Sequence, residues 1–567
     1  MSAQALKAVL ISDFNVANLA AYLRNDAEPP VLEPVVAPYG QVIVSLMSAH
    51  SASWEPKPDV LVVWTRPGGV VPSFERLMQY EQVELGAIFS EVDEFAAAVL
   101  GARERAGFIL VPSWNAPSHH RGFGLLDMKA GLGVRDALMR MNLRLADRLH
   151  QASNIYVLDA SKWVEAVGAR AFEPKLWYTA KIPFGNDVFI EAAKDIKAAV
   201  WAMRGASRKL IVLDLDNTLW GGIVGDLGWE NLRLGGHDHI GEAYLDFQKM
   251  LRALTRRGIL LAVASKNEEA VALEAIEKHP EMVLRLKDFA GWRINWGDKA
   301  ENIADLVAEL NLGLESAVFI DDDPVERARV RESLTDVLVP EWPEDAMLYA
   351  KTLLGLRCFD SRAVSQEDLS RVAMYTSERR RREARIQGGS VEGWLRTLGI
   401  RVRIEALTEA NLQRAAQLLN KTNQLNLTTR RLTEGELLSW GQDSGRRVWT
   451  YRASDRFGDT GLVGILSLEI EHATGRVVDF VLSCRVMGRG VEEAMLFTAL
   501  QHAESVGLKE VQAYYLPTAK NKPCLEFWKR SGLEYDERSN CFSWRFARPY
   551  PRPEHVGIEW ASGETAD

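Results

Sequence analysis

The stretch Leu213-Asp214-Leu215-Asp216-Asn217-Thr218-Leu219 follows an apolar run that begins at Leu210, and it decides the fold of the central part of the chain. A short apolar run of this kind is typical of a buried parallel strand. Asp214 and Asp216 are two residues apart, so both carboxylates face the same side of an extended strand end. One carboxylate of such a pair can attack phosphorus, while the other protonates the leaving oxygen and later activates water. The pair therefore predicts the transfer or hydrolysis of a phosphoryl group.

Two further apolar runs end in polar residues. Residues 259–264 lead to Ser265, and residues 317–320 lead to Asp321 and Asp322. The carboxyl ends of parallel strands form the ligand crevice of an open α/β sheet. We therefore expect the polar residues that follow the three runs to meet in one crevice.

Carboxylates that approach a phosphate need a cation to cancel their charge. Mg²⁺ fits because it takes few carboxylates together with phosphate oxygens and water, and a lysine and hydroxyl groups can hold the transferring oxygens. The predicted catalytic acids are Asp214 and Asp216, the predicted magnesium ligands are Asp214, the carbonyl of Asp216, Asp321 and Asp322, and the predicted phosphate-binding residues are Thr218, Ser265 and Lys299.

These motifs together resemble the haloacid-dehalogenase (HAD) phosphatase superfamily over residues 205–345. The resemblance implies a Rossmann-like parallel sheet with the aspartate pair at its edge. Only about forty residues separate Thr218 from Ile259, and a helix predicted over residues 240–257 fills much of that gap. A large cap domain has no room there, so the crevice is open enough for the end of a phosphopantetheine arm.

Three longer segments resemble the FkbH-like branch of this superfamily. They are residues 213–228 (LDLDNTLWGGIVGDLG), residues 295–303 (NWGDKAENI) and residues 319–327 (FIDDDPVER). This branch is associated with loading a glyceryl unit onto an acyl carrier protein. The resemblance implies 1,3-bisphosphoglycerate as the donor, transfer of its carboxyl end to a thiol, and removal of the remaining phosphate at the HAD site.

Length and composition indicate a multidomain protein of ordinary globular character. The chain has 567 residues, of which 47% are hydrophobic and 26% are charged, and its net charge is -9. The length predicts about three domains, and the negative charge gives no broad attraction to nucleic acid or to an anionic membrane. No apolar stretch approaches the ~20 residues that span a bilayer, and the N-terminus lacks a basic region with a cleavage site. We expect a cytoplasmic protein.

Residues 346–398 are expected to form a helical linker. They contain the basic run Glu378-Arg379-Arg380-Arg381-Arg382-Glu383-Ala384-Arg385. We interpret this run as a solvated helix face, and the alternative is a docking site for an acidic carrier protein.

Residues 399–548 have a different α/β pattern. We expect a strand over residues 400–404, a helix over residues 409–419, and hairpin strands over residues 448–452, 461–470 and 477–483. Gly458 and Gly475 are expected to mark the turns between the hairpin strands.

The segment Arg485-Val486-Met487-Gly488-Arg489-Gly490 leads from the last of these strands into a helix that begins near Val491. Glycines let backbone N–H groups converge, and the helix N-terminus adds partial positive charge, so the loop suits a pyrophosphate. The loop resembles the coenzyme A loop of the GNAT acyltransferases, and residues 521–533 resemble their closing helix. FkbH-like proteins carry such a domain, and residues 423–429 (NQLNLTT) resemble its entry. The resemblance implies a pantetheine or coenzyme A site at Arg485, Gly488, Arg489 and Gly490.

The four cysteines, Cys358, Cys484, Cys524 and Cys541, show no zinc-ligand spacing and are expected to be reduced thiols. Cys484 is expected to be the last residue of the strand before the glycine loop, where Arg485 and Arg489 can lower its pKa. A thiolate that attacks an acyl phosphate makes a thioester. The alternative is a small buried hydrophobe. The resemblance favours catalysis by Cys484, because a cysteine in Ser-Cys-Arg-Val is the suggested acyl carrier of the family. His472 is interpreted as a surface residue rather than a proton acceptor.

Residues 1–195 show a third α/β pattern whose layout is similar to the SGNH hydrolases. Strands are expected over residues 6–12, 60–64 and 155–159, and helices over residues 16–24, 95–103 and 137–150. Where that family has its nucleophile, in Gly-Asp-Ser, this chain has Ser12-Asp13-Phe14, and no Asp-x-x-His follows near residues 176–178. We therefore expect a docking or positioning role without esterase activity, with residues 64–67 and 113–115 lining the crevice. Residues 549–567 are expected to be an unstructured tail.

These patterns predict an α/β multidomain fold, in which a HAD-like Rossmannoid parallel sheet is preceded by an SGNH-like domain and followed by a GNAT-like mixed α/β domain. The leading hypothesis is a magnesium-dependent HAD-type phosphatase coupled to glyceryl transfer from 1,3-bisphosphoglycerate to an acyl carrier protein, for polyketide or related biosynthesis. One alternative is a coenzyme A-dependent acyltransferase and phosphatase that modifies an amino sugar or other amine. The other is a non-enzymatic scaffold for a carrier protein, which the complete set of Asp, Ser and Lys residues disfavours. The order of acylation and dephosphorylation stays open.

Overall fold

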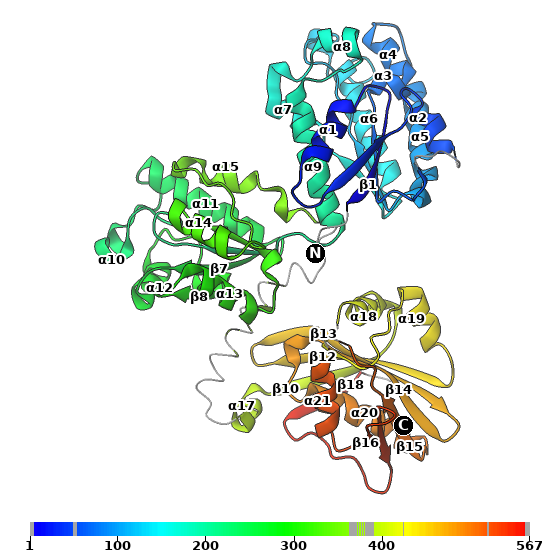
Figure 1. The fold of residues 1–567 in the computed structure, drawn as a ribbon, viewed down its shortest axis with the longest axis vertical. Helices are drawn as coiled ribbons and strands as arrows, with labels where there is room; N and C mark the ends of the chain where they lie inside the picture. The colour runs from blue at the N-terminus through cyan, green and yellow to red at the C-terminus, as the bar shows by residue number, and fades with distance from the viewer. Residues whose placement is uncertain are drawn as a thin grey trace. The chain divides into compact units, whose positions relative to one another are not determined.

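Three β-sheets organise the chain in a computed structural model (Figure 1). The structure describes residues 5–48, 54–361, 371, 374–375, 377, 379, 381, 391–422, 424–518 and 521–561, and it describes only the backbone of residues 391, 392, 421 and 484. By internal contacts the chain divides into two compact units, Met1–Leu210 with Gly313–Ser365 and Ile211–Leu312 with Gln366–Asp567.

The first sheet is five-stranded and parallel, in the order β2-β1-β3-β4-β5. Its strands are β1 (Leu6–Ser12), β2 (Leu32–Val36), β3 (Val60–Trp64), β4 (Phe108–Pro112) and β5 (Ile155–Leu158). The predicted strands at residues 6–12 and 60–64 are confirmed, and β5 is one residue shorter than expected. Sequence patterns had not identified β2 or β4.

Helices cover both faces of this sheet, which explains why β1 and β3 are buried along almost their whole length. One hydrophobic core contains residues of α2 (Val42–Met47), α4 (Pro72–Met78), α5 (Leu85–Gly101) and α6 (Val134–Leu149). The other contains residues of α1 (Ala17–Asn25), α7 (Ser161–Val167) and α9 (Asn186–Met203). Two short helices complete this part. α3 (Pro67–Val70) follows β3, and α8 (Pro174–Ala180) precedes α9.

The second sheet is four-stranded, in the order β8-β7-β6-β9. Its strands are β6 (Leu210–Leu213), β7 (Leu260–Ser265), β8 (Phe289–Ile294) and β9 (Ala317–Ile320). The three predicted strands are therefore confirmed within one residue. Neighbouring strands of this sheet are hydrogen-bonded. The strand order reverses between β6 and β9, and a reversal of this kind opens a crevice at the carboxyl ends of the two strands.

Between β6 and β7 the chain forms only α10 (Val224–Leu227), a 3-10 turn (Trp229–Asn231) and α11 (His239–Thr255). No cap domain is inserted in this fully described segment, as expected. The remaining helices of this part are α12 (Glu269–Lys278), α13 (Lys299–Glu309), α14 (Pro324–Ser333) and α15 (Tyr349–Leu354).

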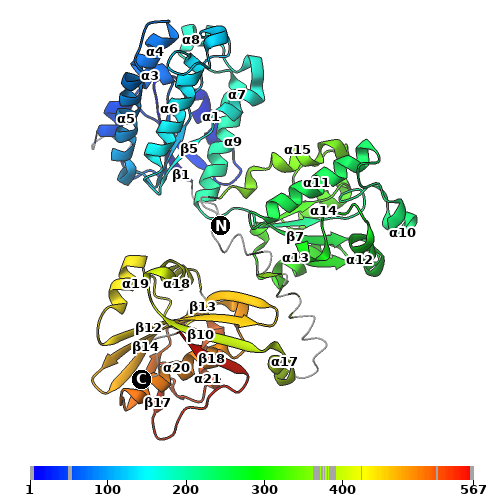
Figure 2. The same cartoon turned by 180° about the vertical axis from the view of Figure 1, so that it is seen from behind.

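The third sheet is mostly antiparallel, in the order β16-β17-β15-β14-β13-β12-β10-β18, with the short β11 paired to β14. Its strands are β10 (Ile400–Ala406), β11 (Leu425–Asn426), β12 (Arg446–Asp455), β13 (Gly458–Glu471), β14 (Thr474–Leu482), β15 (Glu510–Tyr514), β16 (Glu534–Asp536), β17 (Cys541–Arg545) and β18 (Val556–Trp560). The helices of this part are α17 (Val391–Leu398), α18 (Glu409–Lys421), α19 (Glu434–Gly441), α20 (Val491–Ser505) and α21 (Lys522–Arg530). Residues of α20 and α21 belong to one core of this sheet, whereas α18 and α19 belong to another (Figure 2).

The C-terminal segment corrects the prediction of an unstructured tail. Val556–Trp560 forms β18, which pairs in parallel with β10 from Ile400 to Ile404. The proline-rich residues before β18 give no local strand signal, so the pairing with β10 supplies the order.

The hairpin turns also differ from the prediction. The turns lie at residues 456–457 and 472–473, so Gly458 and Gly475 are strand residues rather than turn residues. His472 takes the left-handed backbone conformation at the second turn, with φ 58°. A histidine tolerates this conformation better than most residues. The turn was therefore predicted at the nearby Gly475 instead of at His472.

The basic run is not a solvated face where it is described. Arg381 is 3% exposed, and its Nε and Nη2 donate to the Asp455 carboxylate at 2.6 and 2.8 Å. Arg379 donates to the carbonyl oxygens of Leu286 and Phe289, and its guanidinium lies 4.3 Å from the ring centroid of Trp292. The other members of the run lie outside the described residues.

Of the helices in the described part of the chain, none has the length and apolar character that crossing a bilayer requires.

Candidate active site

Three carboxylates meet at the carboxyl ends of β6 and β9. Oxygen atoms of Asp214, Asp321 and Asp322 all lie within 4.8 Å of one another. Asp214 and Asp321 are buried, and Asp322 is half-buried. Carboxylates at this separation repel one another in a buried site, and oxygen ligands of this kind suit a hard divalent cation. The residues present therefore fit a magnesium-type ion.

Lys299 brings a positive charge to the same carboxylates. It is the first residue of α13, whose start is fixed by the Asp298 side chain, which accepts hydrogen bonds from the backbone N–H groups of residues 300 and 301. Its Nζ lies 3.0 Å from Oδ1 of Asp214, and the two side chains are only 5% and 9% exposed. The ammonium group is therefore held against the Asp214 carboxylate rather than in solvent.

Asp216 is held by three hydrogen-bond donors. Its Oδ1 accepts from Trp220 Nε1 at 2.8 Å and from the backbone N–H of Val224 at 3.0 Å, and its Oδ2 accepts from Asn267 Nδ2 at 2.7 Å. Burial raises the pKa of Asp216, although these hydrogen bonds oppose the shift. Its carboxylate is not part of the three-carboxylate group, so a magnesium contact through its carbonyl stays a prediction.

The turn after β6 depends on Asn217. Its backbone is in the left-handed region with φ 54°, which asparagine tolerates better than most residues. The Asn217 carbonyl accepts a hydrogen bond from Tyr244 Oη at 3.1 Å, and its side-chain oxygen accepts one from the N–H of Gly222 at 2.9 Å. These contacts fix the chain between Asp216 and Gly222.

The predicted phosphate-binding residues all lie in the interior of this region. Thr218 is fully buried one residue beyond Asn217, and Ser265 is 2% exposed as the last residue of β7. Ser265 therefore ends its strand at the expected edge of the sheet. Direct contact of either hydroxyl with phosphate stays a prediction.

Trp220 and Asn267 are two site residues that sequence reasoning missed. Both donate to Asp216. Trp220 is four residues away along the chain, and Asn267 is 51 residues away. Asn267 stands two residues after Ser265, and this spacing at a strand end was the one available signal. Neither residue carries a motif that pairs it with a carboxylate, because the contact exists only in the folded sheet.

The glycine loop before α20 already contains an internal hydrogen-bond acceptor. Gly488 and Gly490 have positive φ values of 71° and 84°, and the N–H of Gly488 donates to Glu492 Oε1 at 2.6 Å. Burial raises the pKa of Glu492 to about 7. Arg489 is buried, and Arg485 Nη1 lies 3.3 Å from Met374 Sδ. Binding of pantetheine or coenzyme A at this loop stays a prediction.

Cys484 does not end a strand as expected. β14 ends at Leu482, and Cys484 opens a 3-10 turn, Cys484–Val486. Its side chain lies outside the described part of the structure, so its catalytic role stays a prediction. Burial raises the pKa of Cys358 and of Cys524 to about 12, which fits their interpretation as structural thiols. Burial also raises the pKa of Cys541.

The crevice of the first sheet lacks a nucleophile at the end of β1. Phe14 is buried and packs edge-on against Trp64 and Phe184, with ring centroids 5.3 and 5.7 Å apart. Ser12 Oγ accepts a hydrogen bond from the N–H of Phe14 at 3.1 Å. The aromatic side chain therefore belongs to the core.

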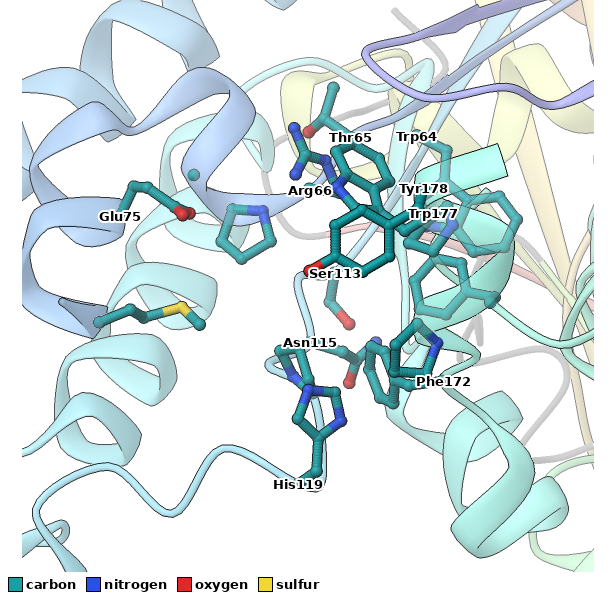
Figure 3. Close-up of a pocket in the computed structure, with 17 residues that line it drawn as sticks. Trp64, Thr65, Arg66, Glu75, Ser113, Asn115, His119, Phe172, Trp177 and Tyr178 are labelled. Atoms are coloured by element: carbon teal, nitrogen blue, oxygen red, sulfur yellow. The ribbon is translucent and has the colours of Figure 1, made fainter. Parts of the chain in front are cut away.

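Most of the residues expected at this crevice line a pocket (Figure 3). Residues 64–67 line it together with Ser113 and Asn115. Trp114 does not line it, because its indole is buried and donates to Thr65 Oγ1 at 2.9 Å.

Comparison with known proteins gives one informative structural match. No protein-family model matches this chain, and no curated protein matches it. The chain is similar to the crystal structure of the N-terminal part of the protein BF1531 from Bacteroides fragilis, which contains a phosphatase domain complexed with Mg. The identity is 29%, the match covers 63% of this chain and 94% of that chain, and the TM-score is 0.57.

Two acetyltransferases are similar to smaller parts of the chain. The ribosomal-protein-S18-alanine N-acetyltransferase from Escherichia coli is 10% identical, with 27% of this chain and 97% of that chain covered and a TM-score of 0.20. The paia N-acetyltransferase from Thermoplasma acidophilum, in complex with coenzyme A, is 15% identical, with 25% and 98% covered and a TM-score of 0.20. Scores this low carry no argument about the C-terminal part. The match to BF1531 supports a HAD-like parallel sheet within an α/β protein, and the carboxylate cluster lies at the edge of that sheet.

Proposed function

We propose that this chain is a magnesium-dependent phosphatase of the FkbH-like branch, coupled to glyceryl transfer from 1,3-bisphosphoglycerate to the phosphopantetheine of an acyl carrier protein. In this proposal the N-terminal part is SGNH-like and non-catalytic, and the C-terminal part is GNAT-like. The observation that carries the phosphatase assignment is the approach of Asp214, Asp321 and Asp322 within 4.8 Å, beside Lys299. The similar domain of BF1531 was crystallised with Mg, which supports magnesium as the ion.

Dephosphorylation follows from the arrangement at the end of β6. An Asp214 carboxylate oxygen attacks the phosphorus of the C3 phosphate ester, and the bond from phosphorus to the C3 oxygen breaks. Asp216, held by Trp220 and Asn267, gives a proton to that oxygen. Asp216 then takes a proton from water, which attacks the aspartyl-phosphate, releases inorganic phosphate and restores Asp214.

The charges of this reaction need two cationic groups. Bound Mg²⁺ supplies Lewis-acid neutralisation of the phosphate oxygens, and the residues that would hold it are Asp214, Asp321 and Asp322. Lys299 balances Asp214 in the resting site and lies close enough to accompany the charge as it moves to the phosphate. Ser265 and Thr218 would donate to the remaining phosphate oxygens.

Acyl transfer uses the other phosphate of the donor as its leaving group. A thiol sulfur attacks the C1 carbonyl carbon, the bond from carbon to the phosphate oxygen breaks, and inorganic phosphate leaves as the thiol proton passes to solvent. Cys484 is the proposed first acceptor, and exchange with the carrier thiol is nearly thermoneutral because one thioester replaces another. The loop with Arg485, Gly488, Arg489 and Gly490 would hold the pantetheine arm.

One contact favours the carrier arm over coenzyme A at this loop. The N–H of Gly488 already donates to Glu492 Oε1, so a carboxylate occupies a backbone donor that a diphosphate would need. The diphosphate of coenzyme A would have to displace this contact, whereas the thiol end of a carrier arm needs no such donor.

Intact-mass analysis of the carrier tests the function. The protein, Mg²⁺, 1,3-bisphosphoglycerate and a holo carrier are expected to give a carrier that gains a glyceryl group without phosphate. Asp214→Asn should give a carrier that retains the phosphoglyceryl group, and the exposed Asp226→Asn in the same segment serves as the matched control with wild-type behaviour. Delivery of phosphate-free product by Asp214→Asn would contradict the assignment.

Cys484→Ala separates the acyl-transfer part of the proposal. The wild-type protein incubated with donor alone is expected to gain a glyceryl or phosphoglyceryl adduct that Cys484→Ala lacks. An adduct of equal yield on the variant removes Cys484 from the pathway. Replacing the carrier by coenzyme A should abolish product formation, and equal product with coenzyme A would favour the amine acyltransferase.

A further inference from the structure

The pocket in the N-terminal part lies at the carboxyl ends of β3 and β4, and its cavity is about 240 Å³. Figure 3 shows Glu75 on one side and the rings of Phe172, Trp177 and Tyr178 on the other, with Ser113 and Asn115 between them. Apolar walls with a few polar groups are typical of a site for a small ligand. The polar groups therefore decide which ligand fits.

Three side chains offer hydrogen-bond donors to the cavity. Thr65 Oγ1 accepts from Trp114 Nε1 at 2.9 Å, and Ser113 Oγ accepts from the N–H of Ala160 at 3.0 Å, so each hydroxyl keeps its own proton for a ligand. Within the described part of the chain, the Asn115 amide has no hydrogen-bond partner. Ser113 and Asn115 are two residues apart beyond the end of β4, and together they suit a carbonyl oxygen.

The charges around the cavity disfavour an anion. The backbone N–H and Nε of Arg66 both donate to the Asp13 carboxylate, at 2.8 and 3.0 Å, so the guanidinium charge is balanced inside the protein. The same guanidinium lies 4.1 Å from the ring centroid of Trp177. Glu75 is exposed and has no partner among the described residues, so its carboxylate accepts an N–H group and repels a negative ligand.

We propose that this pocket binds an uncharged chain that carries amide groups on an aliphatic body, namely the pantetheine arm of a carrier. Ser113 and Asn115 donate to an amide carbonyl oxygen, Glu75 accepts from an amide N–H, and the aliphatic part packs against Trp177 and Tyr178. The identification of the amide as pantetheine rests on the proposed function, which supplies such an arm. The ligand is held without reaction, because Phe14 occupies the nucleophile position and is part of the core.

Calorimetric titration of the full chain with D-pantetheine tests this site. The wild type is expected to bind, and Asn115→Ala and Tyr178→Ala should each raise the Kd at least about tenfold, which is the loss of one good contact. Both positions tolerate truncation, because Asn115 makes no side-chain hydrogen bond to any residue that the structure describes and Tyr178 is 78% exposed. Tyr39→Ala is the matched control: this tyrosine is 55% exposed and lines a different cavity, so its removal should leave the Kd unchanged.

Other probes decide the chemistry of the ligand. Propionate, inorganic phosphate and propylamine are expected to bind at least tenfold more weakly than pantetheine. A capped dipeptide that binds more tightly than pantetheine would overturn the carrier arm in favour of a peptide. Equal pantetheine affinity in wild type, Asn115→Ala and Tyr178→Ala, or the absence of binding to the wild type, would overturn the pocket itself.

The experiment also separates this inference from the proposed function. Asp214→Asn should lose dephosphorylation and keep wild-type pantetheine affinity, because Asp214 lies outside the pocket lining. Pantetheine binding without any glyceryl transfer to a carrier would keep the pocket and refute the function. Glyceryl transfer without pantetheine binding at Asn115 would keep the proposed function and refute the pocket.

Discussion

The first and second sheets place an aspartate directly beyond a buried central strand, yet the two crevices differ in chemistry. Asp13 follows β1 and pairs with Arg66 Nε at 3.0 Å, and Asp214 follows β6 and pairs with Lys299 Nζ at 3.0 Å. Arg66 also donates its backbone N–H to Asp13, which leaves that carboxylate satisfied by one residue. Asp214 instead has two further carboxylates within 4.8 Å.

The residues that follow each aspartate complete the difference. After Asp13 the chain turns Phe14 into the core, whereas after Asp214 it presents Asp216 to three hydrogen-bond donors. A parallel sheet therefore provides the position of a crevice, and the number of carboxylates that gather there decides whether the crevice needs a cation. Among the described residues, the cluster at Asp214 is the one group of three or more potential ligands of this kind.

Removal of magnesium should give the largest contrast between the crevices. Chelation is expected to lower phosphatase activity by a factor of at least about a thousand, because carboxylate repulsion is no longer offset and the phosphate charge is not neutralised. Activity should return when Mg²⁺ is added. Added Mg²⁺ should also raise the unfolding free energy by about 2.7 kcal/mol at a hundred times its Kd, measured by urea unfolding.

Asp321→Asn should weaken this magnesium response, and the exposed Asp305→Asn on α13 is the matched control that should keep it. A wild-type kcat after chelation would contradict this difference between the two crevices. The carboxylates at Asp214 would then need no cation, like the Asp13 carboxylate.

The two ion pairs should differ in their contribution to stability. Lys299→Met leaves a buried cluster of carboxylates without its ammonium and should lower the unfolding free energy by about 3 to 5 kcal/mol in magnesium-free buffer. Arg66→Met should cost about 1 kcal/mol, since Arg66 is 33% exposed and the backbone N–H still donates to Asp13. Urea unfolding of both variants measures the difference. Equal losses would show that the pairs are equivalent.

Titration of Asp13 should give the smallest effect. Burial raises the pKa of Asp13 above its ordinary value, against the opposing contacts with Arg66. The folded protein then binds the proton more tightly than the unfolded chain, so the stability that this group contributes is full below the ordinary pKa and is lost as pH rises through the raised value. Relative to Asp13→Asn, the wild type should therefore lose unfolding free energy as pH rises from 4 to 7.

Asp93 provides a control of opposite sign for this titration. Hydrogen bonds from Arg144 and Arg148 lower the pKa of Asp93. The stability that Asp93 contributes is present above the ordinary pKa and is lost as pH falls. The difference in unfolding free energy between the wild type and Asp93→Asn should therefore become smaller in acid. The difference in unfolding free energy from the wild type should change with pH in opposite directions for Asp13→Asn and Asp93→Asn. The same direction in both variants would contradict the contrast between a buried and a surface carboxylate.

Local sequence patterns predicted the strands that end at the proposed active site. The apolar runs before Asp214, Ser265 and Asp321 became β6, β7 and β9 within one residue, because a buried parallel strand needs continuous apolar side chains.

Other features failed because their cause is not local. β18 forms from a segment after a proline-rich stretch because β10 offers it an open edge. Arg381, read as solvated from its charged neighbours, is buried because Asp455 lies 74 residues further along the chain and receives its guanidinium.

The order of polar residues along the chain indicated the chemistry that we propose, since Asp214, Asp216, Lys299 and Asp321 supply the carboxylates and the cation that phosphoryl transfer needs. Tertiary structure decided how those charges are arranged. The reversal of strand order between β6 and β9 brings Asp321 and Asp322 to Asp214, and the end of β7 brings Asn267 to Asp216. Distances between side chains remote in sequence depend on strand order and packing, which no short pattern of residues encodes.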